Sequence, residues 1–199
     1  MADQQGTTNL IEYGGGEGLL ERLPKGHLIH TLVSEHVQIL VLLRKIDGIR
    51  IKLLTLEVLE EDRDALDILR QFAERLLKTE NHHLREEWVL FAEMEKRGIA
   101  GPSEVIRKEH ELLRHLKKRL MGLSSTGLKK KSFGTITSEI DETTDRLISN
   151  LVAHIHKEDY VLYPAALQVI DDPASWASMR ERCDQIGYGP FSPESASSK

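Results

Sequence analysis

The sequence has very little cysteine and few aromatic residues. Its 199 residues include one cysteine, and aromatic residues make up 5% of the chain. The lone Cys183 excludes an internal disulfide and a metal cluster held by several thiolates of one chain, so we expect a reducing, cytoplasmic location. The N-terminus does not resemble a secretory signal, and no apolar run is long enough to span a bilayer. We therefore expect no membrane partner.

An excess of basic residues is also lacking. The formal net charge is −5 at pH 7, which gives no reason to expect nucleic acid as a partner. The one short basic run, Lys129 to Lys131, lies in a Gly/Ser-rich stretch that we interpret as a solvated loop. What the chain has in abundance is Leu, Glu, Lys and Arg, and these residues favour helix over sheet.

The spacing of apolar residues predicts a single all-α domain. Residues 1–20 are polar and glycine-rich, as in a flexible tail. Spacings of three and four residues then predict helices that contain residues 32–43 and restart after Gly48, followed by helices at about 60–97, 105–121 (closed by Gly122) and 136–170. Such helices favour an antiparallel up-down four-helix bundle over residues 21–171. Residues 172–199 are expected to form a C-terminal cap with a disordered end.

An internal repeat divides the chain into two similar halves. The segment 82–92 recurs 72 residues later as 154–164, with His, Glu, a second acid, an aromatic residue, Val, Leu and an aromatic residue in the same order. A Glu-His pair precedes each copy, Glu35-His36 in the first half and Glu109-His110 in the second. A His and a Glu four residues apart lie one helical turn above each other, so both can point at one metal ion.

Two neighbouring histidines compete for the first His–Glu pair. Both His82 and His83 have a Glu four residues later, and the two side chains point about 100° apart on a helix. Apolar spacing slightly favours His83. The repeat instead aligns His82 with His154, and it aligns His83 with Ile155, which cannot bind a metal. We therefore choose His82.

The other histidines are sorted by the direction in which they point. His156 faces away from His154, and His115 faces away from His110, so both are expected at the surface. His27 and His30 lie near the start of the first helix and are candidates for supporting the site or controlling access to it. The remaining set consists of four imidazoles and two carboxylates from four helices, namely His36, His82, Glu86, His110, His154 and Glu158.

Two metal ions explain this set better than a polar core layer. Burying a carboxylate without a cation costs on the order of several kcal/mol, and we expect no buried Lys or Arg to neutralise Glu86 and Glu158. Imidazole with carboxylate suits iron, manganese or zinc. Six ligands are too many for one tetrahedral ion but suit two ions bridged by both carboxylates. We expect two non-haem iron ions with oxo or hydroxo and carboxylate bridges, with manganese and zinc as alternatives.

These motifs resemble those of the hemerythrin-like (HHE cation-binding) family over most of residues 24–171. The resemblance implies a four-helix bundle with a di-iron centre and the same six ligands. Residues 23–27 and 186–188 resemble a prokaryotic branch related to the DUF438 proteins. Blood-type hemerythrins use five histidines and two carboxylates, so a four-histidine set is more similar to iron-centre repair proteins. Those proteins also carry a Cys pair, which this chain lacks.

The expected function is reversible binding or sensing of dioxygen or nitric oxide, or the holding of iron. The alternative is a di-iron enzyme that scavenges peroxide or nitric oxide, or an iron donor for damaged iron–sulfur clusters. Such chemistry needs a proton donor, for which Tyr160, Tyr163, His30 and Glu35 are candidates. A third hypothesis is a metal-stabilised scaffold that docks a partner through the Lys129 to Lys131 loop or the C-terminal tail. The sequence does not identify a protein partner.

Overall fold

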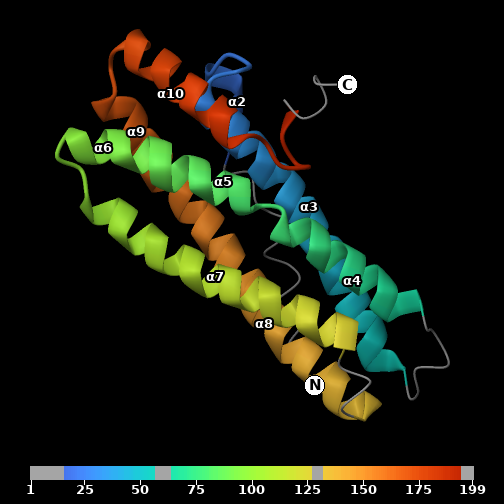
Figure 1. Ribbon diagram of the computed structural model, residues 1–199. Helices are drawn as coiled ribbons and strands as arrows, with labels where there is room; N and C mark the ends of the chain where they lie inside the picture. The colour runs from blue at the N-terminus through green and yellow to red at the C-terminus, as the bar shows by residue number, and fades with distance from the viewer. Residues whose placement is uncertain (1–15, 57–63, 127–131, 194–199) are drawn as a thin grey trace.

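The computed structural model describes residues 16–56, 64–126 and 132–193, and all regular secondary structure in these ranges is helical (Figure 1). The predicted all-α class is therefore confirmed. In chain order the elements are α2 (Glu17–Arg22), α3 (Leu28–Thr55), α4 (Asp64–Leu77), α5 (Glu80–Arg85), η2 (Glu86–Leu90), α6 (Phe91–Lys96), α7 (Gly101–Thr126), α8 (Phe133–Lys157), η4 (Glu158–Leu162), α9 (Tyr163–Val169) and α10 (Pro173–Ile186), where η marks a π-helix.

The long helices pack around a common interior. Helix α3 packs against α4 and α8, and α7 packs against the same two helices. In Figure 1, α5 and α6 extend the line of α4, and α9 extends that of α8. The buried apolar side chains form two clusters, one that includes Leu43, Leu69 and Leu116 and one that includes Leu32 and Phe91. Most of the predicted metal ligands fall in sequence between residues of the two clusters, whereas His154 lies beside Ile155 of the first cluster. A polar layer therefore lies where the two clusters meet.

Two predicted helix ends differ from the structure. Helix α3 continues through Gly48 to Thr55, and α7 continues through Gly122 to Thr126. A glycine inside a helix costs about 1 kcal/mol relative to alanine, which tertiary packing can offset. Beyond Gly48, Leu53 is buried in the first cluster. The predicted 60–97 helix is interrupted by a turn at Lys78 and Thr79.

Several predictions concern segments that the structure describes only in part. Of the expected flexible tail, residues 1–15 lie outside the described residues, whereas residues 17–22 form α2. The basic loop Lys129 to Lys131 and the end of the chain from residue 194 also lie outside them.

Helix α10 contacts α3, α5 and η2. Its N-cap is Asp172, whose side chain accepts a hydrogen bond from the backbone N–H of Ser175 at 2.7 Å.

After α10, two glycines turn the chain back over the α3–α5 side of the molecule. Gly187 has φ +84°, which a residue with a Cβ rarely adopts. At Gly189 a Cβ would lie 2.7 Å from the carbonyl oxygen of Lys78. The segment then buries Phe191 against the first apolar cluster. Residues 187–193 are thus part of the packed structure.

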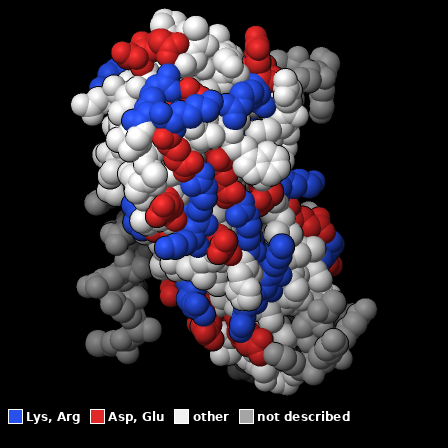
Figure 2. Space-filling model, turned by 60° about the vertical axis from the view of Figure 1, so that its left-hand side comes forward, with Lys and Arg blue, Asp and Glu red and all other residues white. Residues whose placement is uncertain are grey.

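The surface carries mixed charge. Figure 2 shows basic and acidic side chains interspersed over one face of the molecule. Ion pairs such as Arg70 with Glu74 and Arg114 with Glu80, both at 2.8 Å, join exposed or half-buried charges. Among the described helices, none combines the length and apolar character that crossing a bilayer requires.

Candidate metal centre

The two copies of the repeat share an unusual backbone feature. Each contains one π-helical turn, and each turn begins at the predicted carboxylate ligand, Glu86 in η2 and Glu158 in η4. The second copy has Pro164 where the first has Ala92, so the proline is not needed for the turn. Such π-turns inside α-helices are frequently found at functional sites. The backbone therefore repeats along with the sequence motif.

All six predicted ligands are buried, and their polar ends converge. None of them is more than 4% exposed. They come from α3 (His36), α5 and η2 (His82 and Glu86), α7 (His110), and α8 and η4 (His154 and Glu158). The four helices thus meet at one polar layer, as the repeat predicts.

Glu158 lies at the middle of this layer. Its Oε2 atom is 3.1 Å from the Nε2 atom of His36, and its Oε1 atom is 3.1 Å from the Nε2 atom of His154. The two oxygens of one carboxylate therefore face histidines from different helices. Glu86 uses its Oε2 atom toward His82 at 3.5 Å and toward His110 at 3.4 Å. Both carboxylates thus lie between two groups of imidazoles.

The structure keeps the predicted His82 in the cluster and places its neighbour His83 there as well. His83 is 2% exposed, and its ring stacks on that of His110 with centroids 4.0 Å apart. Ring nitrogens of His83, His110 and His154 lie within 4.8 Å of one another, as do ligand atoms of His36, His82 and Glu158. The apolar spacing that favoured His83 agrees with its burial.

A carboxylate also binds the outer nitrogen of each of the four predicted histidines. The distances from Nδ1 to oxygen are 2.8 Å for His36 to Asp159, 2.6 Å for His82 to Glu35, 2.6 Å for His110 to Glu87 and 3.0 Å for His154 to Glu109. A carboxylate only accepts, so Nδ1–H is the donor, and in the neutral form of each imidazole Nε2 would carry the lone pair toward the centre. This pattern is typical of metal-binding histidines.

These outer acids follow the sequence repeat. Glu35 and Glu109, which precede the first histidine of each half, bind the second histidine of the same half. Glu87 and Asp159, which follow the two predicted carboxylate ligands, bind the first histidine of the opposite half. Each half therefore supports a predicted ligand of the other half in the same way.

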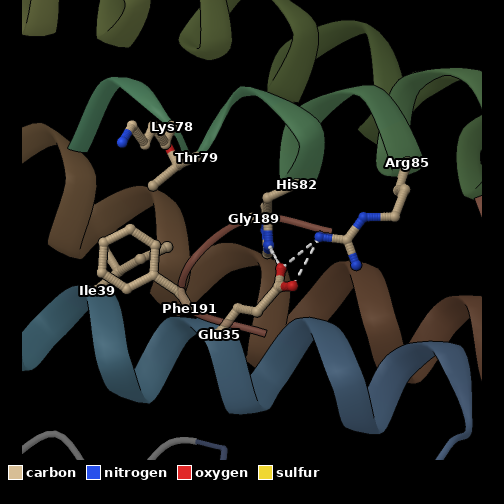
Figure 3. A pocket seen from close by; sticks show the side chains of 8 residues that line it. All are labelled: Glu35, Ile39, Lys78, Thr79, His82, Arg85, Gly189 and Phe191. Carbon is tan, nitrogen blue, oxygen red and sulfur yellow. Dashed lines mark hydrogen bonds and ion pairs between the residues drawn. The ribbon is translucent and has the colours of Figure 1, made fainter. Parts of the chain in front are cut away.

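Two buried cations lie near the cluster, but neither is paired with Glu86 or Glu158, the two carboxylates that we expected to lack a Lys or Arg partner. Arg85 is fully buried, and its Nη2 atom donates to both oxygens of Glu35 at 2.7 Å (Figure 3). Lys117 is 3% exposed, and its Nζ donates to the Thr79 hydroxyl at 2.6 Å. Within the described ranges, neither cation forms an ion pair with Glu86 or Glu158. The two central carboxylates are thus still not neutralised by a Lys or Arg.

The buried carboxylates of the site favour positive charge at its centre. Burial alone would raise the pKa of the Glu158 carboxyl, but His154, His110 and His36 hold it well below its usual range. Burial alone would lower the pKa of His110, but Glu158, Glu86 and Glu87 raise it to about 11. Metal ions would supply the same positive charge as these protons.

His83 behaves differently. Burial, followed by the nearby charges of Lys117 and His110, lowers the pKa of His83 well below its usual range. Its imidazole is therefore neutral, which is the form that binds a metal ion.

Unpaired buried atoms show that the residues fit a metal centre. Within the described part of the chain, no hydrogen-bond partner is present for Glu86 Oε2, His110 Nε2, His154 Nε2, Glu158 Oε1 or Glu158 Oε2. Leaving a buried polar atom unpaired costs about 1–3 kcal/mol. Coordination to metal ions would satisfy all five atoms, and nitrogen with oxygen donors suits iron, manganese or zinc.

The four candidate proton donors separate into two groups. Tyr163 is buried, and its hydroxyl donates to Oε1 of Glu86 at 2.6 Å. Glu35 is also buried and accepts the hydrogen bond from His82 described above. Tyr160 is 50% exposed. His30 contacts Ser34 on its own helix. Only Tyr163 and Glu35 thus lie beside the predicted ligands.

The remaining histidines lie outside the cluster. His27 is the N-cap of α3, and its Nδ1 accepts from the N–H of Ile29 at 3.2 Å. His115 is exposed. His156 is also exposed, and its ring lies 4.3 Å from that of Tyr160.

Comparison with known proteins agrees with this geometry. No curated protein matches the chain. The model of the hemerythrin HHE cation-binding domain matches residues 27–166, which span every residue of the cluster described above. Because this match covers well over half of the sequence, the chain belongs to the hemerythrin HHE cation-binding family.

Proposed function

We propose that this protein holds two non-haem iron ions and uses them to bind or sense dioxygen or nitric oxide. The observation that carries the proposal is the position of Glu158, whose two oxygens face histidines of different helices. One ion would lie at His36 and His82, and the other at His110 and His154. Glu86 and Glu158 would bridge them. When bound, the iron ions would supply open coordination positions for a diatomic ligand.

We include His83 as a fifth histidine ligand. Its ring stacks on that of His110, and its ligand atom lies within 4.8 Å of those of His110 and His154. The set then contains five histidines and two carboxylates, the composition that the resemblance gives for blood-type hemerythrins. This composition favours gas binding over the repair function suggested by the four-histidine set.

The surrounding residues would keep such a centre rigid and dry. The Nδ1 hydrogen bonds to acids fix the orientation of the imidazoles before any ion binds. Apolar clusters above and below the polar layer exclude water from it. We also infer that α3, α4 to α6, α7, and α8 to α9 form an antiparallel four-helix bundle. The lone, buried Cys183 fits a reducing location such as the cytoplasm.

The test is a visible spectrum of the iron-loaded protein. Protein reconstituted with ferrous iron without air should take up about two ions per chain. It should then develop charge-transfer bands on addition of dioxygen, and different bands with nitric oxide. A colourless protein that retains zinc and shows no response to either gas would contradict the proposal and favour a metal-stabilised scaffold.

One contact favours a second candidate, a di-iron enzyme that scavenges peroxide or nitric oxide. The buried Tyr163 hydroxyl donates to Glu86 at 2.6 Å, beside the proposed ions. Burial and the charge of Glu86 raise the pKa of Tyr163 well above its usual range, so the phenol keeps a proton to donate. Under this hypothesis Tyr163→Phe abolishes turnover of peroxide or nitric oxide and keeps the iron. Unchanged turnover would exclude Tyr163 as the donor.

A further inference from the structure

Lys117 is a buried cation beside the proposed metal centre. It lies on α7, seven residues and nearly two turns after His110, so both side chains leave the same face of the helix. Its Nζ atom is 3.4 Å from Nε2 of His83. Nδ1 of His83 is 3.9 Å from Glu80, a partly exposed residue of the same helix, so we take Nε2 as the nitrogen that would bind a metal ion. Lys117 therefore lies next to the atom with which His83 would bind a metal ion.

The ammonium group of Lys117 has few partners. It carries three N–H donors. One is taken by Thr79, whose own hydroxyl proton is directed to the carbonyl oxygen of Leu76 at 2.8 Å. A second faces His83. Within the described residues, no carboxylate lies within ion-pair distance of Nζ, although a buried charge without a counter-ion is costly.

Metal binding would remove the contact between Lys117 and His83. A metal ion bound to Nε2 uses the lone pair that faces the ammonium group, so the two compete for the same acceptor. Once the metal is bound, an N–H of Lys117 is left pointing into the centre. Glu86 and Glu158, whose charges act on Lys117, would offset only part of the positive charge of two metal ions and an ammonium group, so a further anion would be stabilised there.

We propose that Lys117 is a binding residue for a small anion at the metal centre, held in place by Thr79. The proposal rests on the proposed function, because the anion would bind at the iron ions. It predicts that the centre prefers anionic ligands over neutral ligands of similar size. Thr79 also lines the pocket of Figure 3, so the residue that holds Lys117 borders a depression at the surface of the polar layer.

The experiment compares azide, an anion, with nitric oxide, which is neutral. Iron-loaded wild type and Lys117→Met are titrated with each ligand, and dissociation constants are read from the visible bands. Losing a hydrogen bond from a charged donor should weaken azide binding about tenfold or more. Nitric oxide binding should change less than about twofold, because no charge is involved. The exposed neighbour Lys118 provides a matched control, and Lys118→Met should leave both constants unchanged.

A second variant covers the case in which Lys117→Met does not retain iron. Thr79→Val keeps the ammonium group but removes its hydrogen-bond partner, and it should weaken azide binding roughly two- to tenfold while sparing nitric oxide. Equal changes for both ligands, or unchanged azide binding, would overturn the role of Lys117. A wild type that binds neither iron nor azide would instead refute the proposed function.

Discussion

Removal of Arg85 should strongly destabilise the protein, because it would leave a buried carboxylate without its cation. Arg85 is fully buried and Glu35 is 2% exposed, and one Nη atom lies 2.7 Å from both carboxylate oxygens. Breaking a buried pair by removing one partner costs about 3–5 kcal/mol. Glu35 keeps its hydrogen bond to His82, so we expect the lower end, about 3 kcal/mol.

Arg85→Met is the variant to measure, by thermal unfolding of the metal-free protein followed by circular dichroism. For a protein of this size, about 3 kcal/mol corresponds to a fall in Tm of roughly 6–12 °C. Lys96 is a matched control, because it is 64% exposed and pairs with Glu93 at 2.9 Å at the surface. Lys96→Met should change stability by less than about 0.5 kcal/mol.

A double variant tests the cause of the loss. Arg85→Met combined with Glu35→Gln removes both charges, so it should recover at least half of the lost Tm. If Arg85→Met alone lowers Tm by less than about 2 °C, or if the double variant is the less stable of the two, the ion pair does not have the role given to it here.

The remaining predictions concern the metal and pH. His154→Ala should lower iron from about two ions per chain, whereas the exposed His156→Ala should not. Loss of iron in both variants would contradict the assignment of His154, and not His156, as a ligand. His83→Ala should also lower iron content if five histidines bind, and unchanged content by elemental analysis would restore the four-histidine set. The raised pKa of His110, about 11 in the folded protein against 6.5 when unfolded, contributes stability that is fully present below pH 6.5 and is lost as the pH rises toward 11. The Tm of the metal-free protein should therefore fall from pH 6.5 to 9, and that of the iron-loaded protein should fall less, because bound ions require unprotonated ligands. Parallel curves for the two forms would contradict this linkage.

The repeat made most of the site predictable from the sequence. A His and a Glu one helical turn apart, found twice at matching positions, identified residues that the structure brings together from different helices. Two of the outer acids could also be seen in the repeat, because Glu35 and Glu109 each precede a predicted ligand, His36 and His110. Their pairing across helices could not be predicted, since it depends on how the helices are rotated and on the π-turns at Glu86 and Glu158.

The residues that the sequence did not identify are those that break the repeat. His83 has Ile155 as its counterpart, so the alignment that selected His82 also removed His83. Lysine and arginine usually lie at the surface of a protein, and only the packing shows that Lys117 and Arg85 are buried. For Lys117, the seven-residue spacing from His110 was the available signal, because it places both on one helix face.

The position of the metal ions is the most direct test of this account. Crystals of the iron-loaded protein, measured at the iron absorption edge, should give two anomalous peaks roughly 3.5–4 Å apart. One peak should lie at His36 and His82, the other at His83, His110 and His154, with Glu86 and Glu158 between them. A single peak, or peaks away from Glu158, would contradict the proposed centre.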